Sequence, residues 1–204
     1  MTLADYKDLG SRLVDPVVGV ADSVGLTPNQ VSLLAFLLAI VAAAVFAVGP
    51  TVAAPVAAVI VVVSGGLDVA DGELARRRGG GTDRGDFLDH VLDRYSDLVL
   101  LVGVAAGTGA WLLGTVALTG VFLTSYMGTQ AQAVGAGRDY GGLLGRADRI
   151  GLLVLGGLLQ PLDATVHFGV GIGVTPLVAV LGIYAVLGNL TAMQRFRATW
   201  RELA

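Results

Sequence analysis

Three stretches of this chain carry no charged side chain, and their length is the strongest constraint on its fold. They run over residues 23–67, 98–137 and 164–194. A helix that crosses the hydrocarbon core of a bilayer needs about 20 mostly apolar residues. Each uncharged stretch is longer than that, and the first two are long enough for two such helices. We therefore expect an all-α, polytopic membrane protein rather than a soluble domain.

The composition excludes several other classes of protein. Apolar residues make up 54% of the chain and charged residues 14%, whereas a soluble domain has about 25% charged residues. The 204 residues include no cysteine, which rules out a disulfide framework, an iron–sulfur cluster and a zinc–cysteine site. The net charge of −3 argues against binding to nucleic acid, because such proteins usually carry a basic surface.

Glycine, proline and polar clusters divide the chain into a surface helix and six predicted spans. Residues 1–22 place apolar positions at helical spacing between charged ones, which favours an amphipathic helix lying on the membrane surface. Thr27 and Pro28 suit the cap and the first turn of a helix. The spans are predicted over residues 27–48, 51–78, 84–106, 110–133, 147–161 and 175–194. We interpret residues 1–204 as one domain, with a six-helix bundle over 29–199.

The basic residues predict how the protein is oriented. Of the 13 lysines and arginines, all but Arg94 lie outside the spans or at their ends on one side. They lie before the first span, around the turn between spans two and three, between spans four and five, or after span six. Arg94 lies inside span three, toward the same side. The opposite turns, near residues 49, 108 and 165, hold none. The positive-inside rule then places both termini and the polar loops in the cytoplasm. We expect a multi-pass protein of the plasma membrane with a site that faces the cytoplasm.

Two predicted spans contain carboxylates inside the membrane, where charged groups are costly and usually functional. Asp68 and Asp71 are three residues apart in the second span and share a helix face. Asp89 and Asp93 are four apart in the third span and share another. The glycine turn at 79–81 joins these antiparallel helices, so the two acidic faces are expected to meet. At 1.5 Å per residue they lie about 12 Å inside the cytoplasmic boundary.

Carboxylates that face one another at low dielectric repel strongly unless a positive group lies between them. All-oxygen ligands suit hard divalent cations such as Mg²⁺, Mn²⁺ or Ca²⁺, and two close ions recur in displacement reactions at phosphorus. A purely structural alternative pairs the carboxylates with the nearby arginines. A divalent-cation transporter is a further alternative, although the outer halves of the spans are almost wholly apolar. A non-catalytic scaffold would leave the buried carboxylates unexplained.

The carboxylates belong to a longer pattern with defined spacing. It is Asp68-x2-Asp71-Gly72-x2-Ala75-Arg76-x8-Gly85-x3-Asp89-x3-Asp93. These eight residues over 26 positions resemble the signature of the CDP-alcohol phosphotransferases at every position. The six-span layout and the tripeptide Thr27-Pro28-Asn29 also resemble that family. Its members transfer a phosphatidyl-type group from a CDP-linked lipid to an alcohol and release CMP.

The resemblance implies a role for each residue of the pattern. Two divalent ions, Mg²⁺ or Mn²⁺, would be held by Asp68, Asp71, Asp89 and Asp93. The CDP-linked lipid would contact Gly72, Ala75, Arg76 and Gly85. Within these sets, Asp93 would also act as the general base for the acceptor hydroxyl, and Arg76 would bind the diphosphate. Asp86 and Asp97 lie outside the pattern and receive no catalytic role. The resemblance also implies a homodimer.

Later segments resemble the branch of the family that makes inositol-phosphate lipids. They are Ser125-Tyr126, Gly141-Gly142, Arg146-Ala147-Asp148-Arg149 and Gln194-Arg195. The arginines of that branch bind the acceptor's phosphate, which implies this role for Arg146, Arg149 and Arg195. The chain departs from the branch at 128–130, where Gly-Thr-Gln replaces a Lys-Ala-Arg run. We expect a phosphorylated polyol similar to inositol phosphate as the acceptor, with glycerol 3-phosphate as the alternative.

Overall fold

The computed structural model describes residues 7–49, 51–137, 141–162, 166–168 and 172–203, and this part of the chain is helical apart from one short hairpin. The helices are α1 (Lys7–Ser23), α2 (Pro28–Val48), α3 (Ala54–Arg77), α4 (Asp83–Thr108), α5 (Trp111–Ala133), α6 (Arg146–Leu159), α7 (Pro176–Ile183) and α8 (Asn189–Glu202). A 3₁₀ turn, η2 (Gln160–Leu162), follows α6, and a π-helical segment, η3 (Tyr184–Gly188), joins α7 to α8. The all-α prediction is confirmed.

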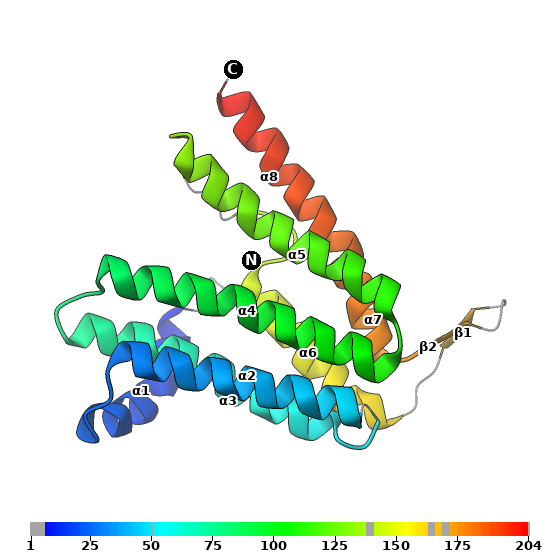
Figure 1. Ribbon diagram of the computed structural model, residues 1–204, viewed down its shortest axis with the longest axis horizontal. Coiled ribbons are helices and arrows are strands. Elements are labelled where there is room, and N and C mark those ends of the chain that lie inside the picture. The colour runs from blue at the N-terminus through cyan, green and yellow to red at the C-terminus, as the bar shows by residue number, and fades with distance from the viewer. Residues whose placement is uncertain (1–6, 50, 138–140, 163–165, 169–171, 204) are drawn as a thin grey trace.

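The hairpin was not predicted from the sequence. Its strands, β1 (Val166–Phe168) and β2 (Ile172–Val174), pair antiparallel with Val166 opposite Val174. It lies at the edge of the molecule, between α6 and α7 (Figure 1). Short strands with β-branched and aromatic residues fit such a pairing, but three residues are too few to give a periodic signal in the sequence.

The start of α2 follows the predicted cap. Thr27 Oγ1 accepts a hydrogen bond from the Gln30 backbone N–H at 3.3 Å, and Gln30 Oε1 accepts one from the Thr27 N–H at 2.8 Å. This reciprocal pair is a capping box, which satisfies two backbone donors that the first helical turn leaves free. Pro28 occupies the first turn, where its missing N–H costs nothing.

The turn between α3 and α4 brings the two acidic helices together. Gly79 and Gly80 have φ angles of 99° and 109°, a left-handed conformation that only glycine adopts without strain. Thr82 then caps α4, because its Oγ1 accepts a hydrogen bond from the Gly85 N–H at 3.1 Å. The end of α3 and the start of α4 therefore lie next to each other, as the sequence predicts.

The helices form two packed groups (Figure 1). Helices α2, α3, α4 and α6 lie side by side, while α5 pairs with the continuous helix Pro176–Glu202 that contains α7, η3 and α8. Glycines allow the backbones to approach closely. A Cβ atom at Gly103 would overlap the backbone of Ala43, and one at Gly107 would overlap the backbone of Phe46. These contacts hold α4 against α2.

Four helical stretches of the described residues are long and apolar enough to cross a membrane: Pro28–Val48, Ala54–Arg77, Trp111–Ala133 and Pro176–Glu202. The chain is therefore a multi-pass membrane protein. Of the other predicted spans, α4 has 26 residues but carries several charged groups, and α6 has only 14 residues. Both pack lengthwise against helices that qualify. The number of six spans stays a prediction.

One helix end differs from the sequence prediction, and the start of the N-terminal helix cannot be compared. The last helix continues to Glu202 instead of ending near 194, because its polar end still has good helix formers. The N-terminal helix is α1, which runs over Lys7–Ser23; residues 1–6 lie outside the described part of the chain. Helix α1 packs on α3 through the buried Val18 and through an ion pair of 2.6 Å between Asp15 and Arg77. Its position on a membrane stays a prediction.

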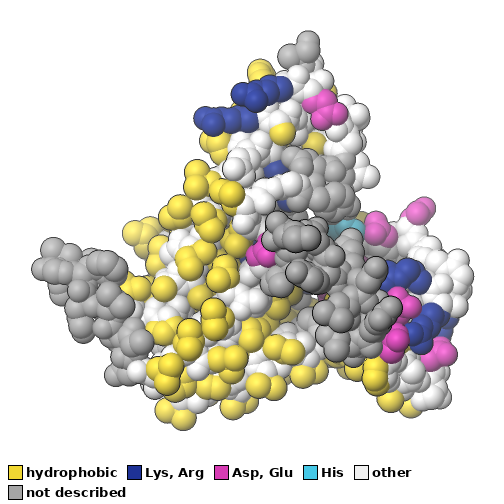
Figure 2. Space-filling view, turned by 180° about the vertical axis from the view of Figure 1, so that it is seen from behind, with side chains coloured by type: hydrophobic (Ala, Val, Ile, Leu, Met, Phe, Trp, Pro, Cys, Tyr) yellow, Lys and Arg dark blue, Asp and Glu magenta, His cyan; other side chains and the backbone are white. Residues whose placement is uncertain are grey.

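Hydrophobic side chains cover the left and lower parts of the surface shown in Figure 2. Basic and acidic side chains gather at the right and at the top of that view. Because Figure 2 is turned by 180° from Figure 1, its right-hand end corresponds to the left-hand end of Figure 1. That end contains α1, the end of α3 and the start of α4. The top of both views is the end of α8. An apolar belt with charged ends is the surface expected of a protein in a bilayer.

Candidate active site

Three of the four predicted metal ligands lie together. Asp68 and Asp71 on α3 and Asp89 on α4 each offer a carboxylate oxygen, and these oxygens lie within 4.8 Å of one another. We call Asp68, Asp71 and Asp89 the aspartate trio. Divalent ions such as Mg²⁺ and Mn²⁺ bind oxygen at about 2.0–2.6 Å, so oxygens at this separation can surround one ion.

The burial of the trio supports the fit to a metal. Asp71 is 6% exposed, and its Oδ2 has no hydrogen-bond partner within the described residues. A buried carboxylate oxygen without a partner is costly unless a cation binds it. A hard divalent cation matches this all-oxygen donor set. The trio therefore fits a divalent metal held between α3 and α4.

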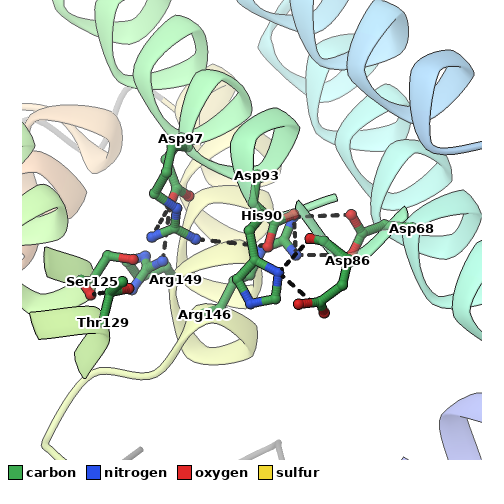
Figure 3. A network of polar contacts seen from close by, with 10 residues as sticks. Asp68, Asp86, His90, Asp93, Asp97, Ser125, Thr129, Arg146 and Arg149 are labelled. Carbon is green, nitrogen blue, oxygen red and sulfur yellow. Dashed lines mark hydrogen bonds and ion pairs between the residues drawn. The ribbon is translucent and has the colours of Figure 1, made fainter. Parts of the chain in front are cut away.

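Asp93 lies one turn further along α4 and contacts an arginine instead. Arg146 Nη1 lies 2.5 Å from Asp93 Oδ1 and 2.9 Å from Asp68 Oδ2, and Arg146 Nη2 donates to Asp68 Oδ1 at 3.1 Å (Figure 3). The Asp93 side chain is only 12% exposed. One guanidinium from α6 thus joins a member of the aspartate trio to the predicted general base.

Of the arginines proposed from sequence as purely structural partners, Arg76, Arg77 and Arg78 pair with other carboxylates. Arg76 pairs with Glu73 at 2.8 Å and Arg78 pairs with Asp22 at 2.6 Å. Both are at the surface, where such pairs add little stability. The structural alternative is therefore realised only in part. Arg94, one of those arginines, lies 3.7 Å from Asp93 Oδ2, and Arg146, which was not among them, makes the closer contact.

Further ion pairs extend from Asp93 along α4. Arg94 Nη2 lies 3.7 Å from Asp93 Oδ2, and its Nη1 lies 3.4 Å from Asp97 Oδ2. Arg149 Nη2 donates to the same Asp97 oxygen at 3.0 Å. Six groups of alternating charge, from three helices, form what we call the ion-pair ladder: Asp68, Arg146, Asp93, Arg94, Asp97 and Arg149. Figure 3 shows its labelled members in one network.

Asp97 received no role from the sequence, yet it joins two arginines. It follows Asp93 by four residues, so helical spacing places it on the same face of α4. That spacing was the available signal, and the family pattern ends before reaching it. The Arg149 side chain that it binds is 7% exposed, and the Tyr184 hydroxyl donates to the Arg149 backbone carbonyl. Arg149 is thus fixed from two sides.

Arg195 is the one predicted acceptor residue that lies outside the ladder. Its Nε donates to the Gly141 carbonyl at 2.9 Å, and its Nη1 donates to the Thr124 carbonyl at 2.9 Å. These bonds tie α8 to α5 and to the loop before α6. The structure therefore brings Arg146 and Arg149 together with the carboxylates and places Arg195 against the backbone of neighbouring elements.

The four predicted lipid-binding residues line one cleft beside the trio. The cleft has a volume of about 470 Å³ and lies between the ends of α2, α3 and α4. Its lining includes Gly72, Ala75, Arg76 and Gly85, together with Asp71 and Asp89 of the trio. A Cβ at Gly85 would lie 3.3 Å from Asn29 Oδ1, so glycine keeps this corner open. Thr27 and Asn29 also line the cleft, although no site role was predicted for either of them.

A comparison with known protein families decides the identity of this site. Residues 25–191, most of the chain, match the CDP-alcohol phosphatidyltransferase family. The chain belongs to this family.

Relatives of this CDP-alcohol phosphatidyltransferase cover nearly its whole length. The archaetidylinositol phosphate synthase of Methanothermobacter thermautotrophicus is 33% identical over 98% of this chain and 95% of its own. The phosphatidylinositol phosphate synthase of Mycobacteroides abscessus is 30% identical over 94% of this chain and 86% of its own.

Solved structures agree with these sequence comparisons. The crystal structure of Mycobacterium tuberculosis phosphatidylinositol phosphate synthase with CDP-DAG bound matches with a TM-score of 0.77 at 27% identity, over 93% of this chain and 94% of that one. The structure of the same enzyme in complex with manganese and citrate also gives 0.77 at 27% identity, over 92% and 88% of the two chains.

Family membership establishes the reaction class. This CDP-alcohol phosphatidyltransferase is a membrane enzyme of phospholipid synthesis that uses a CDP-linked lipid and an alcohol acceptor. The family uses divalent metals, and the aspartate trio has the donor set and the spacing to hold one. A cation transporter is not favoured.

Proposed function

We propose that this enzyme transfers a phosphatidyl-type group from a CDP-linked lipid to a hydroxyl of a phosphorylated polyol similar to inositol phosphate. One observation carries the choice of a phosphorylated acceptor. The ion-pair ladder places the guanidinium groups of Arg146 and Arg149 beside Asp93 and the aspartate trio. Arginine forks suit a phosphate group. Both relatives named above make inositol-phosphate lipids, which supports this acceptor over glycerol 3-phosphate.

The carboxylates have two different roles in the proposed reaction. The trio would hold the divalent metal, which would supply polarisation of the phosphoryl group and stabilisation of the charge of the leaving CMP. Asp93 accepts the proton of the acceptor hydroxyl as the hydroxyl oxygen bonds to phosphorus. The bond between that phosphorus and the bridging diphosphate oxygen breaks, and CMP leaves. Asp93 is joined to the trio through Arg146, which contacts both Asp68 and Asp93.

The substrates enter from two sides of these carboxylates. The CDP-linked lipid occupies the cleft of Gly72, Ala75, Arg76 and Gly85, where the glycines leave room for the nucleotide and Arg76 binds the diphosphate. The acceptor's phosphate binds Arg146, Arg149 and Arg195, the last of these after rearrangement of its backbone contacts.

The acceptor is tested by CMP release. Purified protein with Mn²⁺ or Mg²⁺ is given a CDP-linked lipid and, in separate reactions, an inositol monophosphate, free inositol, glycerol 3-phosphate or serine. We expect the fastest release with the inositol monophosphate. Faster release with glycerol 3-phosphate would overturn the acceptor, and no release with any of the four would overturn the proposed function.

We also propose that the enzyme lies in the plasma membrane as a homodimer with its active site facing the cytoplasm. The basic ends of α3 and α8 support this orientation, and the family resemblance supports the dimer. Because the chain has no cysteine, single cysteines report topology cleanly. In intact cells, Thr51→Cys should react with an impermeant maleimide and Glu202→Cys should not. The reverse result would refute the orientation, and a monomeric mass in mild detergent would refute the dimer.

A further inference from the structure

We propose that Arg146 is an internal counter-ion that competes with the divalent metal for Asp68 and Asp93, and that it moves to the acceptor's phosphate when the metal binds. Metal and phosphorylated acceptor would then favour each other's binding. The second half of this inference rests on the proposed function. The first half concerns only the carboxylates and Arg146.

The position of the guanidinium is the first observation. Arg146 Nη1 contacts oxygens of two aspartates on two different helices, at 2.9 Å for Asp68 and 2.5 Å for Asp93. Its Nη2 takes the second oxygen of Asp68 at 3.1 Å. Both oxygens of Asp68 therefore accept hydrogen bonds from one cation. Figure 3 shows Arg146 reaching these two carboxylates from α6.

Asp68 is also a member of the aspartate trio, and this double use creates the competition. Its ligand oxygen lies within 4.8 Å of those of Asp71 and Asp89, so an ion bound by the trio would lie only a few ångströms from the Arg146 guanidinium. Two positive groups at that separation in a poorly solvated site repel strongly. Binding of the metal to Asp68 therefore weakens the interaction of Asp68 with Arg146, and the reverse also holds.

The role of Asp93 gives a second reason for Arg146 to move. A general base needs a free oxygen lone pair toward the hydroxyl it deprotonates. Arg146 Nη1 lies 2.5 Å from Asp93 Oδ1 as an ion pair, and this buried oxygen has no hydrogen-bond partner among the described residues. Arg94 lies further away, 3.7 Å from Asp93 Oδ2. The Arg146 guanidinium therefore occupies the space beside Asp93 Oδ1 that a hydroxyl would need, and its departure opens that space.

Arg146 has room and unused donors for such a move. It is the first residue of α6, directly after the loop that ends at Gly145. Its side chain is 29% exposed, and its Nε is buried without a hydrogen-bond partner among the described residues. Arg149, one turn later on the same helix, also has an unpartnered Nε. A phosphate oxygen would satisfy these donors, which the carboxylates leave unused.

Thermodynamic linkage turns this exchange into a measurable coupling. If the metal displaces Arg146 and the phosphate receives it, each ligand raises the affinity for the other by the same factor. A variant without the arginine would bind metal more tightly by itself and would lose the coupling. A role of Arg146 in merely holding α6 in place predicts neither change.

The test is a calorimetric titration in which Mn²⁺ is added to the purified protein in detergent and its affinity is measured. We expect Arg146→Gln to bind Mn²⁺ about tenfold more tightly than the native protein, which corresponds to about 1.4 kcal/mol. Arg76→Gln removes one positive charge near the same cleft, but its partner is Glu73, so its affinity should change less than about threefold. Unchanged or weaker Mn²⁺ binding by Arg146→Gln would overturn the proposal.

The coupling is tested by repeating the titration with a saturating inositol monophosphate, with free inositol as the control that lacks phosphate. The phosphate should tighten Mn²⁺ binding to the native protein and leave that of Arg146→Gln unchanged. Equal effects on both proteins would refute the transfer. Arg146→Lys keeps the positive charge but lacks the two-pronged guanidinium, so it should give an intermediate Mn²⁺ affinity. It replaces Arg146→Gln in the test if the glutamine variant does not fold. If the acceptor panel refutes the proposed function, the titration without acceptor still decides the competition.

Discussion

Replacing Asp97 with asparagine should weaken both the fold and the binding of the acceptor. The change keeps the shape of the side chain and removes the one negative charge that Arg94 and Arg149 share. The Asp97 and Arg149 side chains are 14% and 7% exposed, so solvent cannot replace the lost charge. We therefore expect two poorly solvated arginines to repel each other and to shift away from their present positions.

The structure sets the size of the effect. Removing one partner of a buried ion pair costs about 3–5 kcal/mol. The lower end applies here, because asparagine can still accept the hydrogen bond from Arg149 and because Arg94 is 26% exposed. About 3 kcal/mol corresponds to a fall in melting temperature of about 6–12 °C for a chain of this size. The KM for the acceptor should rise about tenfold or more, while the KM for the CDP-linked lipid stays within about twofold.

Asp86→Asn is the matched control for this experiment. It makes the same chemical change on the same helix, but the Asp86 side chain is 76% exposed and its ion-pair partner is His90, at 3.4 Å. Melting is followed in detergent, and CMP release is measured while one substrate is varied at a time. If Asp97→Asn melts like the control and keeps the native KM for the acceptor, Asp97 does not position the arginines. Rescue by Asp97→Glu would support the charge as the cause.

Four further outcomes test the carboxylates and the packing. Excess chelator should abolish CMP release and added Mn²⁺ should restore it; full turnover in chelator would refute the metal. Asp71→Asn should weaken Mn²⁺ binding by at least about tenfold, because a hard cation needs the lost charge, and native affinity by calorimetry would contradict the trio. Asp93→Asn should lower kcat by about 10²–10⁴ while Mn²⁺ still binds; loss of metal equal to that of Asp71→Asn would make Asp93 a ligand first. Gly107→Val should prevent folding, since its Cβ would overlap the Phe46 carbonyl, whereas Gly66→Val, with open space around it, should fold; normal expression of Gly107→Val would contradict the packing of α4 on α2.

The sequence predicts best what depends on neighbouring residues. The cap at Thr27 and the glycine turn at 79–81 are both present, because capping and turn formation involve groups only a few residues apart. The meeting of Asp68, Asp71 and Asp89 also follows from local features. Helical spacing puts the first two on one face of α3. Because the turn is short, α4 must run antiparallel to α3 and lie next to it.

Contacts between distant segments could not be predicted in the same way. Arg146 and Asp68 are 78 residues apart, and Arg149 and Asp97 are 52 apart. In the sequence these arginines are basic residues of a cytoplasmic loop, and resemblance alone gives them a further role. Which carboxylate each one contacts depends on how α6 packs against α3, and nothing in the spacing of the chain specifies that packing.

The same physical cause places Arg146 both at the membrane boundary and in the site. In the proposed orientation, a positive residue at the start of α6 stays on the cytoplasmic side because moving its charge across the bilayer is costly. From the first turn of α6 its guanidinium contacts Asp68 at 2.9 Å and Asp93 at 2.5 Å. Carboxylates in such a place are costly to keep ionised unless a cation lies beside them. The chain therefore carries its own cation to this site, and a metal that takes its place must release an arginine next to the position where a phosphate is to bind.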